Sequence, residues 1–119
     1  MALMTFELPH GIKGTTEEGE TLLYREVGLR ELNAGDIIDA QLEAEQVIVK
    51  NGQVLSYVSD VMMGIGLLRR QVEFVGEIKG PLSLSQIKRL HVEDLNTLQT
   101  KGRELDMALN KDLAERGRS

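Results

Sequence analysis

The spacing of apolar residues changes at Leu32, and this change divides the chain into two parts. Before it, residues 3–8 form a short β-prone segment, and residues 21–32 alternate imperfectly between apolar and polar side chains. The stretch between them, residues 11–19, is rich in turn-forming residues. Residues 1–32 are therefore predicted to form a β-hairpin with a long loop.

After Leu32, three short motifs share a layout that is typical of a helix start. Each places an apolar residue before a cap, an acid or amide at the third helical position and an apolar residue at the fourth. The predicted caps are Asn33, Ser83 and His91. Ser83 with Gln86 is the best capping box, because both side chains can satisfy free backbone N–H groups. Asp36 and Asp94 are expected to act mainly through the helix dipole.

These starts predict three helices with amphipathic patterns. The first covers about residues 34–46, with its buried side formed by Ile37, Ile38, Leu42 and Val47. A short helix covers residues 84–90, and a long one covers residues 92–114. The long helix carries one apolar stripe, made of Leu95, Leu98, Gly102, Leu105, Leu109 and Leu113.

Residues 47–55 support two interpretations. Asn51-Gly52 between β-branched residues is a strong hairpin signal. However, apolar residues recur at helical spacing through Val54, Val58, Val61, Ile65, Leu68 and Val72. The longer pattern favours a loop at Asn51-Gly52 followed by a helix over residues 53–70, and the hairpin remains the alternative. Gly64 and Gly66 within this helix imply a closely approaching backbone or a break.

The sum of these elements predicts the fold class. Residues 70–78 are either a short strand or an irregular connector. We expect one domain over residues 1–119 of the α+β class, mostly α. It would consist of an N-terminal β-hairpin (1–32), a small bundle of about four helices (33–114) and a frayed tail (115–119).

Composition excludes several classes of function. The chain has no cysteine, so it has no disulfide, thiol chemistry or cysteine-based zinc site. No apolar run reaches the roughly 20 residues that cross a bilayer. Aromatic residues make up 3% and the net charge is −5, which argues against binding to nucleic acid. We therefore expect a cytoplasmic protein with no membrane or nucleic-acid partner.

No arrangement of residues predicts catalysis, a cofactor or a metal. The acidic pairs of the first helix are typical of a solvated face: Asp36 with Asp39, and Glu43 with Glu45. His10 and His91 lie in different elements with no acid fixed between them. Gly64-Ile65-Gly66 lacks the strand and third glycine of a nucleotide-binding loop. The sequence therefore predicts that the chain is not an enzyme.

The candidate partner-binding residues are apolar or cationic and lie in the central segment: Leu55, Val58, Met62, Met63, Arg69 and Arg70. Thioethers adapt to varied partners, although filling the core is the more common role for residues such as Met62 and Met63. Charge is also uneven, with 11 acids and 4 bases in residues 1–60 against 8 and 10 in residues 61–119. This asymmetry, together with the glycine-containing apolar pattern, predicts packing against a partner or a homo-oligomer.

Three stretches carry a family resemblance. They are residues 27–37, including Leu29-Arg30-Glu31-Leu32-Asn33-Ala34-Gly35-Asp36-Ile37; residues 70–82, including Gly76, Ile78 and Gly80-Pro81-Leu82; and Leu90 with Asp94-Leu95. On these residues the chain resembles the tail assembly proteins of Mu-like contractile-tailed phages and their prophages, which are grouped with tail-tape-measure assembly chaperones. The resemblance covers about residues 20–110.

The resemblance implies a function. Such a protein coats the long, apolar tape-measure protein in the cytoplasm of the infected or lysogenic bacterium and keeps it soluble. It leaves as tail tube subunits polymerise and is absent from the mature virion. A frameshifted longer form with a second domain often accompanies the short form, and the family has no catalytic residues to transfer. The alternatives are a structural subunit retained in the tail and a small regulatory protein-binding module.

Overall fold

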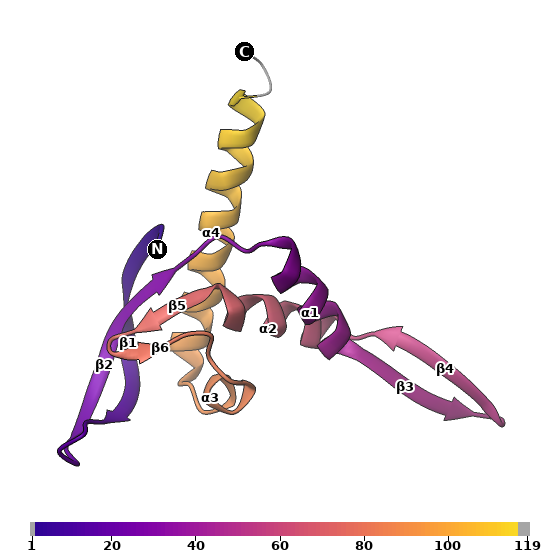
Figure 1. Ribbon diagram of the computed structural model, residues 1–119, viewed down its shortest axis with the longest axis horizontal. Helices are drawn as coiled ribbons and strands as arrows, with labels where there is room; N and C mark the ends of the chain where they lie inside the picture. Colours follow the sequence, from indigo (N-terminus) through magenta and orange to yellow (C-terminus); the bar gives the residue numbers. More distant parts are fainter. Residues whose placement is uncertain (1, 117–119) are drawn as a thin grey trace.

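The computed structural model describes residues 2–116, which form three projections from a small centre (Figure 1). A four-stranded sheet lies on one side, a two-stranded hairpin extends on the opposite side, and the C-terminal helix rises between them. The molecule measures 54 × 49 × 24 Å. Its radius of gyration is 17.0 Å, whereas a compact chain of this length would have about 13.5 Å. An unusually large part of the chain therefore lies away from the core.

The main sheet is antiparallel, in the order β1-β2-β5-β6. Its strands are β1 (Met4–Thr15), β2 (Thr21–Leu29), β5 (Val72–Val75) and β6 (Ile78–Lys79). The predicted pairing of the first two strands is present, but Val27 of β2 also pairs with Val75 of β5. The prediction of an N-terminal hairpin followed by a helical bundle is therefore wrong. The fold is mixed α/β, because the segment after α2 adds two strands to the hairpin.

Helices α1 (Ala34–Ala44) and α2 (Asp60–Gln71) pack against each other. The predicted cap is confirmed, since Asn33 and Asp36 form a reciprocal capping box. A Cβ added at Gly66 would lie 3.3 Å from the Cβ of Ala40, so this glycine permits the close approach of α1. The buried side of α1 is formed by Ala40 and Ala44.

The predicted buried side of the first helix is exposed. Ile37, Ile38 and Leu42 are 43%, 55% and 65% exposed, and Val47 is 64% exposed. The prediction was wrong because the narrow alanine face of α1 already fills its contact with α2. The larger apolar side chains consequently face outward and remain about half exposed.

Residues 45–58 form the projecting hairpin, which is called the arm below. Strands β3 (Glu45–Lys50) and β4 (Gln53–Val58) pair without a register shift. Asn51 and Gly52 have φ angles of 52° and 75°, as a two-residue type I′ turn requires. The favoured helix over residues 53–70 is therefore wrong in its first part, and the hairpin alternative is correct. Helix α2 begins after Ser59, whose hydroxyl accepts the N–H of Met62 at 3.3 Å.

The last two helices begin near the predicted positions. Ser83 and Gln86 form the predicted capping box at α3 (Leu84–Lys88). Helix α4 (Val92–Arg116) packs its first half against β1 and α2. Its backbone extends through residues 115–116 of the predicted tail, and residues 117–119 lie outside the described part of the chain.

The core lies where the sheet meets α2, α3 and the lower half of α4. It is built from Leu8, Val27, Leu29, Leu68, Val72, Val75, Leu82, Ile87, Leu98 and Leu105. The stripe of α4 is buried only as far as Leu105; Leu109 is partly buried and Leu113 is 62% exposed, because the helix extends past the other elements. Among residues 2–116, no helix is both long and apolar enough to span a membrane.

Candidate functional site

A pocket of about 620 Å³ lies between α2 and α4, and we call it the α2–α4 groove. One wall is the face of α2 on which Val61, Gly64, Ile65 and Leu68 recur at helical spacing. The other wall is the first half of α4. The complete lining is Leu32, Asp60, Val61, Gly64, Ile65, Leu67, Leu68, Gln71, Leu95, Gln99, Gly102, Arg103 and Asp106. The lining is apolar along its length and carries charges from Asp60, Arg103 and Asp106.

Two glycines give the groove its shape. A Cβ on Gly102 would lie 3.0 Å from Oε1 of Gln71 and 3.4 Å from Leu68, so this glycine lets α4 approach α2. A Cβ on Gly64 would meet nothing within 4 Å. A glycine inside a helix costs about 1 kcal/mol relative to alanine. At Gly66 and Gly102 the lack of a side chain allows a neighbouring helix to pack closely. Gly64 has no such neighbour and faces open space within the described structure.

A polar contact fixes the two walls of the groove. The side chain of Gln71 is almost fully buried, and its Nε2 donates a hydrogen bond to Oδ1 of Asp106 at 3.1 Å. Since a buried amide needs its partners, this contact restrains α4 against the end of α2. The groove is therefore a preformed feature of the fold.

The arm is a second exposed apolar surface. Its large apolar side chains are between 43% and 71% exposed: Val47, Ile48, Val49, Val54, Leu55, Tyr57 and Val58. A two-stranded hairpin alone is marginally stable in water. Large exposed apolar patches mark interaction sites. The arm therefore has the character of a surface that binds another molecule.

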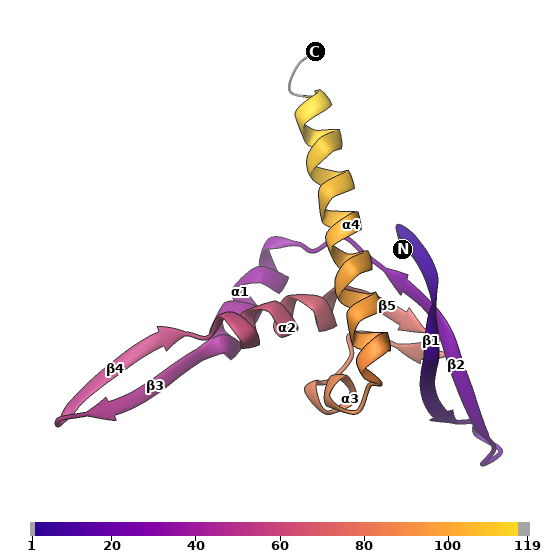
Figure 2. The ribbon, with the colours of Figure 1, turned by 180° about the vertical axis from the view of Figure 1, so that it is seen from behind.

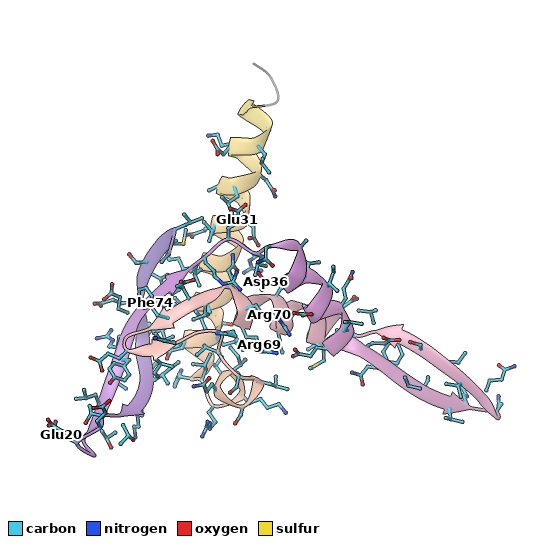
Figure 3. All side chains as sticks on the ribbon, viewed as in Figure 1. Glu20, Glu31, Asp36, Arg69, Arg70 and Phe74 are labelled. Carbon is cyan, nitrogen blue, oxygen red and sulfur yellow. The ribbon has the colours of Figure 1, made fainter. Side chains whose placement is uncertain are left out.

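The two predicted arginines are engaged inside the molecule. Both Arg69 and Arg70 form ion pairs with Glu43 of α1. The hydrogen bond from Arg69, helped by Arg70, lowers the pKa of Glu43 to about 2 despite partial burial. Figure 3 shows both arginines at the centre of the molecule, near the end of α2. They join α1 to α2, so their guanidinium groups are structural.

Residues 8–118 match the family described as tail assembly protein gp41. The chain is 48% identical over 101 residues to the probable tail assembly protein gp41 of Escherichia phage Mu, covering 83% of this chain and 69% of that protein. It is 37% identical over 94 residues to the Mu-like prophage FluMu protein gp41 of Haemophilus influenzae, covering 78% and 74%. The chain belongs to the gp41 tail assembly protein family. The resemblance found in the sequence is confirmed.

A further relative of this gp41 family member is longer. The probable tail assembly protein FS-gp41 of Escherichia phage Mu is 47% identical over 100 residues. That alignment covers 82% of this chain and 53% of the relative, so the chain spans about half of that protein's length. No solved structure matches the chain.

The six predicted partner-binding residues of this family member do not form one surface. Leu55 and Val58 are exposed on the arm. Met62 and Met63 are half-buried on α2, outside the lining of the groove, and the arginines pair with Glu43. Sequence reasoning missed the wall of α4 that completes the groove. Gly64 was the one sequence signal of the groove, because a glycine inside a helix indicates that another backbone can approach closely there.

The two histidines of the chain are closer than expected. The rings of His10 and His91 stack with centroids 3.6 Å apart, and Nε2 of His10 lies 3.5 Å from Oε2 of Glu93. The ligand atoms of these three residues lie within 4.8 Å of one another. However, the ring planes are only 15° apart, so the in-plane lone pairs do not converge on a common point. This exposed cluster does not form a cation site as arranged.

Proposed function

We propose that this gp41 family member is a non-catalytic tail assembly chaperone that binds the tape-measure protein. It keeps that protein soluble in the cytoplasm of the bacterial host and leaves when tail tube subunits polymerise around it. It is absent from the mature virion. Membership of the tail assembly family supports the general role, and the surface of the chain supports the chaperone activity.

The observation that carries the proposal is the α2–α4 groove with Gly64 on its open wall. Amphipathic helices bind in apolar grooves through side chains spaced three and four residues apart. The distance between packed helices depends on the side chains at their contact, and a glycine allows a close approach. Gly64 leaves that space open, while Val61 and Ile65 flank it. The groove therefore suits an apolar helical segment of the tape-measure protein.

The charge of the chain supports the same role. A protein with a net charge of −5 keeps a complex soluble through repulsion between its copies. Apolar surface on the arm and on α1 is available for further contacts with a long client; Leu55 and Val58 are the exposed arm residues in this set. We therefore assign the groove to the main contact and these residues to supporting contacts.

Filling the groove tests this proposal. Gly64→Arg places a long side chain over Val61 and Ile65, and the open space at Gly64 should let the variant fold. We expect it to lose co-purification with the tape-measure protein co-expressed from the same phage or prophage. Gly64→Ala is the matched intermediate variant, because it adds only a methyl group to the open space, and it should weaken binding much less than Gly64→Arg does. Equal co-purification of both variants would contradict the groove as the binding site.

Mass spectrometry of purified virions tests the other part of the proposal. The chaperone should be absent from intact particles and present in lysates during assembly. Detection at a fixed ratio to the tail tube subunit would identify a structural subunit retained in the tail, which is the alternative interpretation.

A further inference from the structure

The arm has an exposed strand edge that differs from the edges of the main sheet. β1 is interrupted by Pro9 and by a register shift between Glu7 and Ile12, and β6 is only two residues long. Such features protect sheet edges from pairing with other chains. β4 has none of them, since Gln53–Val58 contains no charge and no proline, and its register is regular. The same chain thus blunts two edges and leaves β4 open.

Both faces of the arm carry large exposed apolar side chains among polar ones, which is unusual for an exposed hairpin. One face carries the pairs Val47 with Ser56 and Val49 with Val54. The opposite face carries Ile48 with Leu55. Strands that are apolar on both faces are normally buried inside larger sheets. Figure 2 shows that the arm stands clear of every other described element. Its residues therefore fit a larger sheet than this chain supplies alone.

We propose that β4 pairs, antiparallel, with β4 of a second copy of this chain, giving a four-stranded intermolecular sheet in the order β3-β4-β4-β3. The two-residue turn makes Lys50 and Gln53 a hydrogen-bonded pair. Alternate residues of β4 therefore direct their backbone N–H and C=O groups away from β3, toward the open edge. These outward residues are Val54, Ser56 and Val58. They form the edge available to the second copy.

A twofold axis at Ser56 uses this edge fully. It places Ser56 opposite Ser56 of the second copy and Val54 opposite Val58, so all outward N–H and C=O groups are paired. Leu55 then faces Tyr57 across the axis. No charges oppose each other in this register. The equivalent pairing of β3 would place Glu45 opposite Val49, which makes the β4 edge the better one.

The molecule as a whole exposes more surface than a compact protein of its size, and the arm is one of the three projections that account for the excess. The chain exposes 8177 Å², whereas a compact protein of 13.3 kDa exposes about 6,450 Å². The difference is about twice the ~800 Å² that each partner buries in a standard interface. A helical client has no free backbone edge, whereas a second copy presents one that matches. A second copy is therefore the occupant that the edge favours.

Light scattering with size exclusion tests the pairing with the purified chain and no tape-measure protein present. Its outcome is therefore independent of the proposed chaperone function. We expect the wild type to have twice the mass of the chain. Ser56→Pro removes the central outward N–H and the side-chain hydrogen bond to Glu45 but leaves the backbone hydrogen bonds within the hairpin, and it should be monomeric. Ser56→Thr keeps the N–H and should remain dimeric.

Cysteine cross-linking supplies a second measurement, because the natural chain has no cysteine. At the proposed axis the two Cα atoms of residue 56 would be about 5.5 Å apart, within the range that a disulfide spans. Under mild oxidation Ser56→Cys should form covalent dimers much faster than Lys50→Cys, which lies on the other strand. A monomeric wild type, or equal cross-linking of the two variants, would overturn the proposal.

Discussion

The carboxylate of Asp94 accepts a hydrogen bond from the backbone N–H of Gly11 at 2.9 Å, which fastens the first turn of α4 to the irregular part of β1. Its other oxygen accepts the N–H of His10 at the same distance. Asp94 is fully buried. Its role is thus a tertiary one, beyond the dipole effect expected from the sequence. It satisfies two amides that the bulge removes from the β1–β2 ladder.

Replacing Asp94 with alanine should destabilise the protein markedly. The variant leaves two backbone N–H groups without an acceptor, and hydrogen bonds to charged groups contribute about 1.5–3 kcal/mol each. We expect the free energy of unfolding to fall by about 3–6 kcal/mol in urea denaturation. The exposed neighbour Glu93 is the control, and Glu93→Ala should change stability by less than about 0.5 kcal/mol. Similar losses in both variants would contradict the role of Asp94.

Acid should weaken the contact of α1 with α2 and its contact with Arg30, which follows β2. Arg69 and Arg70 lower the pKa of Glu43 from 4.5 to about 2, and Arg30 lowers the pKa of Asp36 from 3.8 to about 2. Because both pKa values are depressed in the folded state, these carboxylates contribute stability fully above about pH 4.5. The contribution is lost as the pH falls toward 2.

Glu43→Gln isolates one part of this pH dependence. At pH 7 it should lower the free energy of unfolding by about 1.5–3 kcal/mol, because the ion pairs are lost. At pH 2 the difference from the wild type should largely disappear, since Glu43 is then substantially protonated. Urea denaturation at both pH values measures the effect, and Asp39→Asn on the exposed face of α1 is the control. A constant difference at both pH values would refute the assigned ion pairs.

The two central glycines of α2 should respond differently to alanine. Gly64→Ala should raise the free energy of unfolding by about 1 kcal/mol, because the added methyl group meets nothing. Gly66→Ala should show no such gain, since its Cβ would lie 3.2 Å from Nη1 of Arg70 and 3.3 Å from Ala40. Thermal denaturation of both variants compares them. A larger stabilisation by alanine at position 66 than at position 64 would contradict the close contact of Gly66 with Ala40 of α1.

The caps should differ in strength. Ser83→Ala should cost about 0.5–2 kcal/mol, the usual effect of losing an N-cap. Asp36→Ala should cost more, because Asp36 also accepts two hydrogen bonds at 2.8 Å from Arg30. This order reverses the one expected from the dipole alone. Urea denaturation of the two variants measures it, and an equal or smaller cost at Asp36 would argue against the Arg30 contact.

Local chemistry determined the helix starts. At Asn33 and Ser83 the capping atoms lie within three residues of the N–H groups that they satisfy, so the sequence contained the whole interaction. Ser59 carries the same kind of signal, but the apolar spacing from Val54 to Val61 extended the predicted helix across it. The Asn51-Gly52 turn is equally local and indicated the hairpin that the structure contains, although the helical spacing was favoured over it.

Tertiary structure decided the features that depend on distant partners. β5 became a strand because β2 offers it an edge, and no short-range pattern could identify that partner. Ile38 and Leu42 have the spacing of a buried face, yet Ala40 makes the contact with α2 instead. The carboxylate of Asp94 binds β1 and not its own helix, because the irregular part of β1 has two backbone N–H groups without a partner in the sheet. The chemical type of an apolar or acidic side chain determines what kind of group it can contact. Which group it does contact depends on how the whole chain packs.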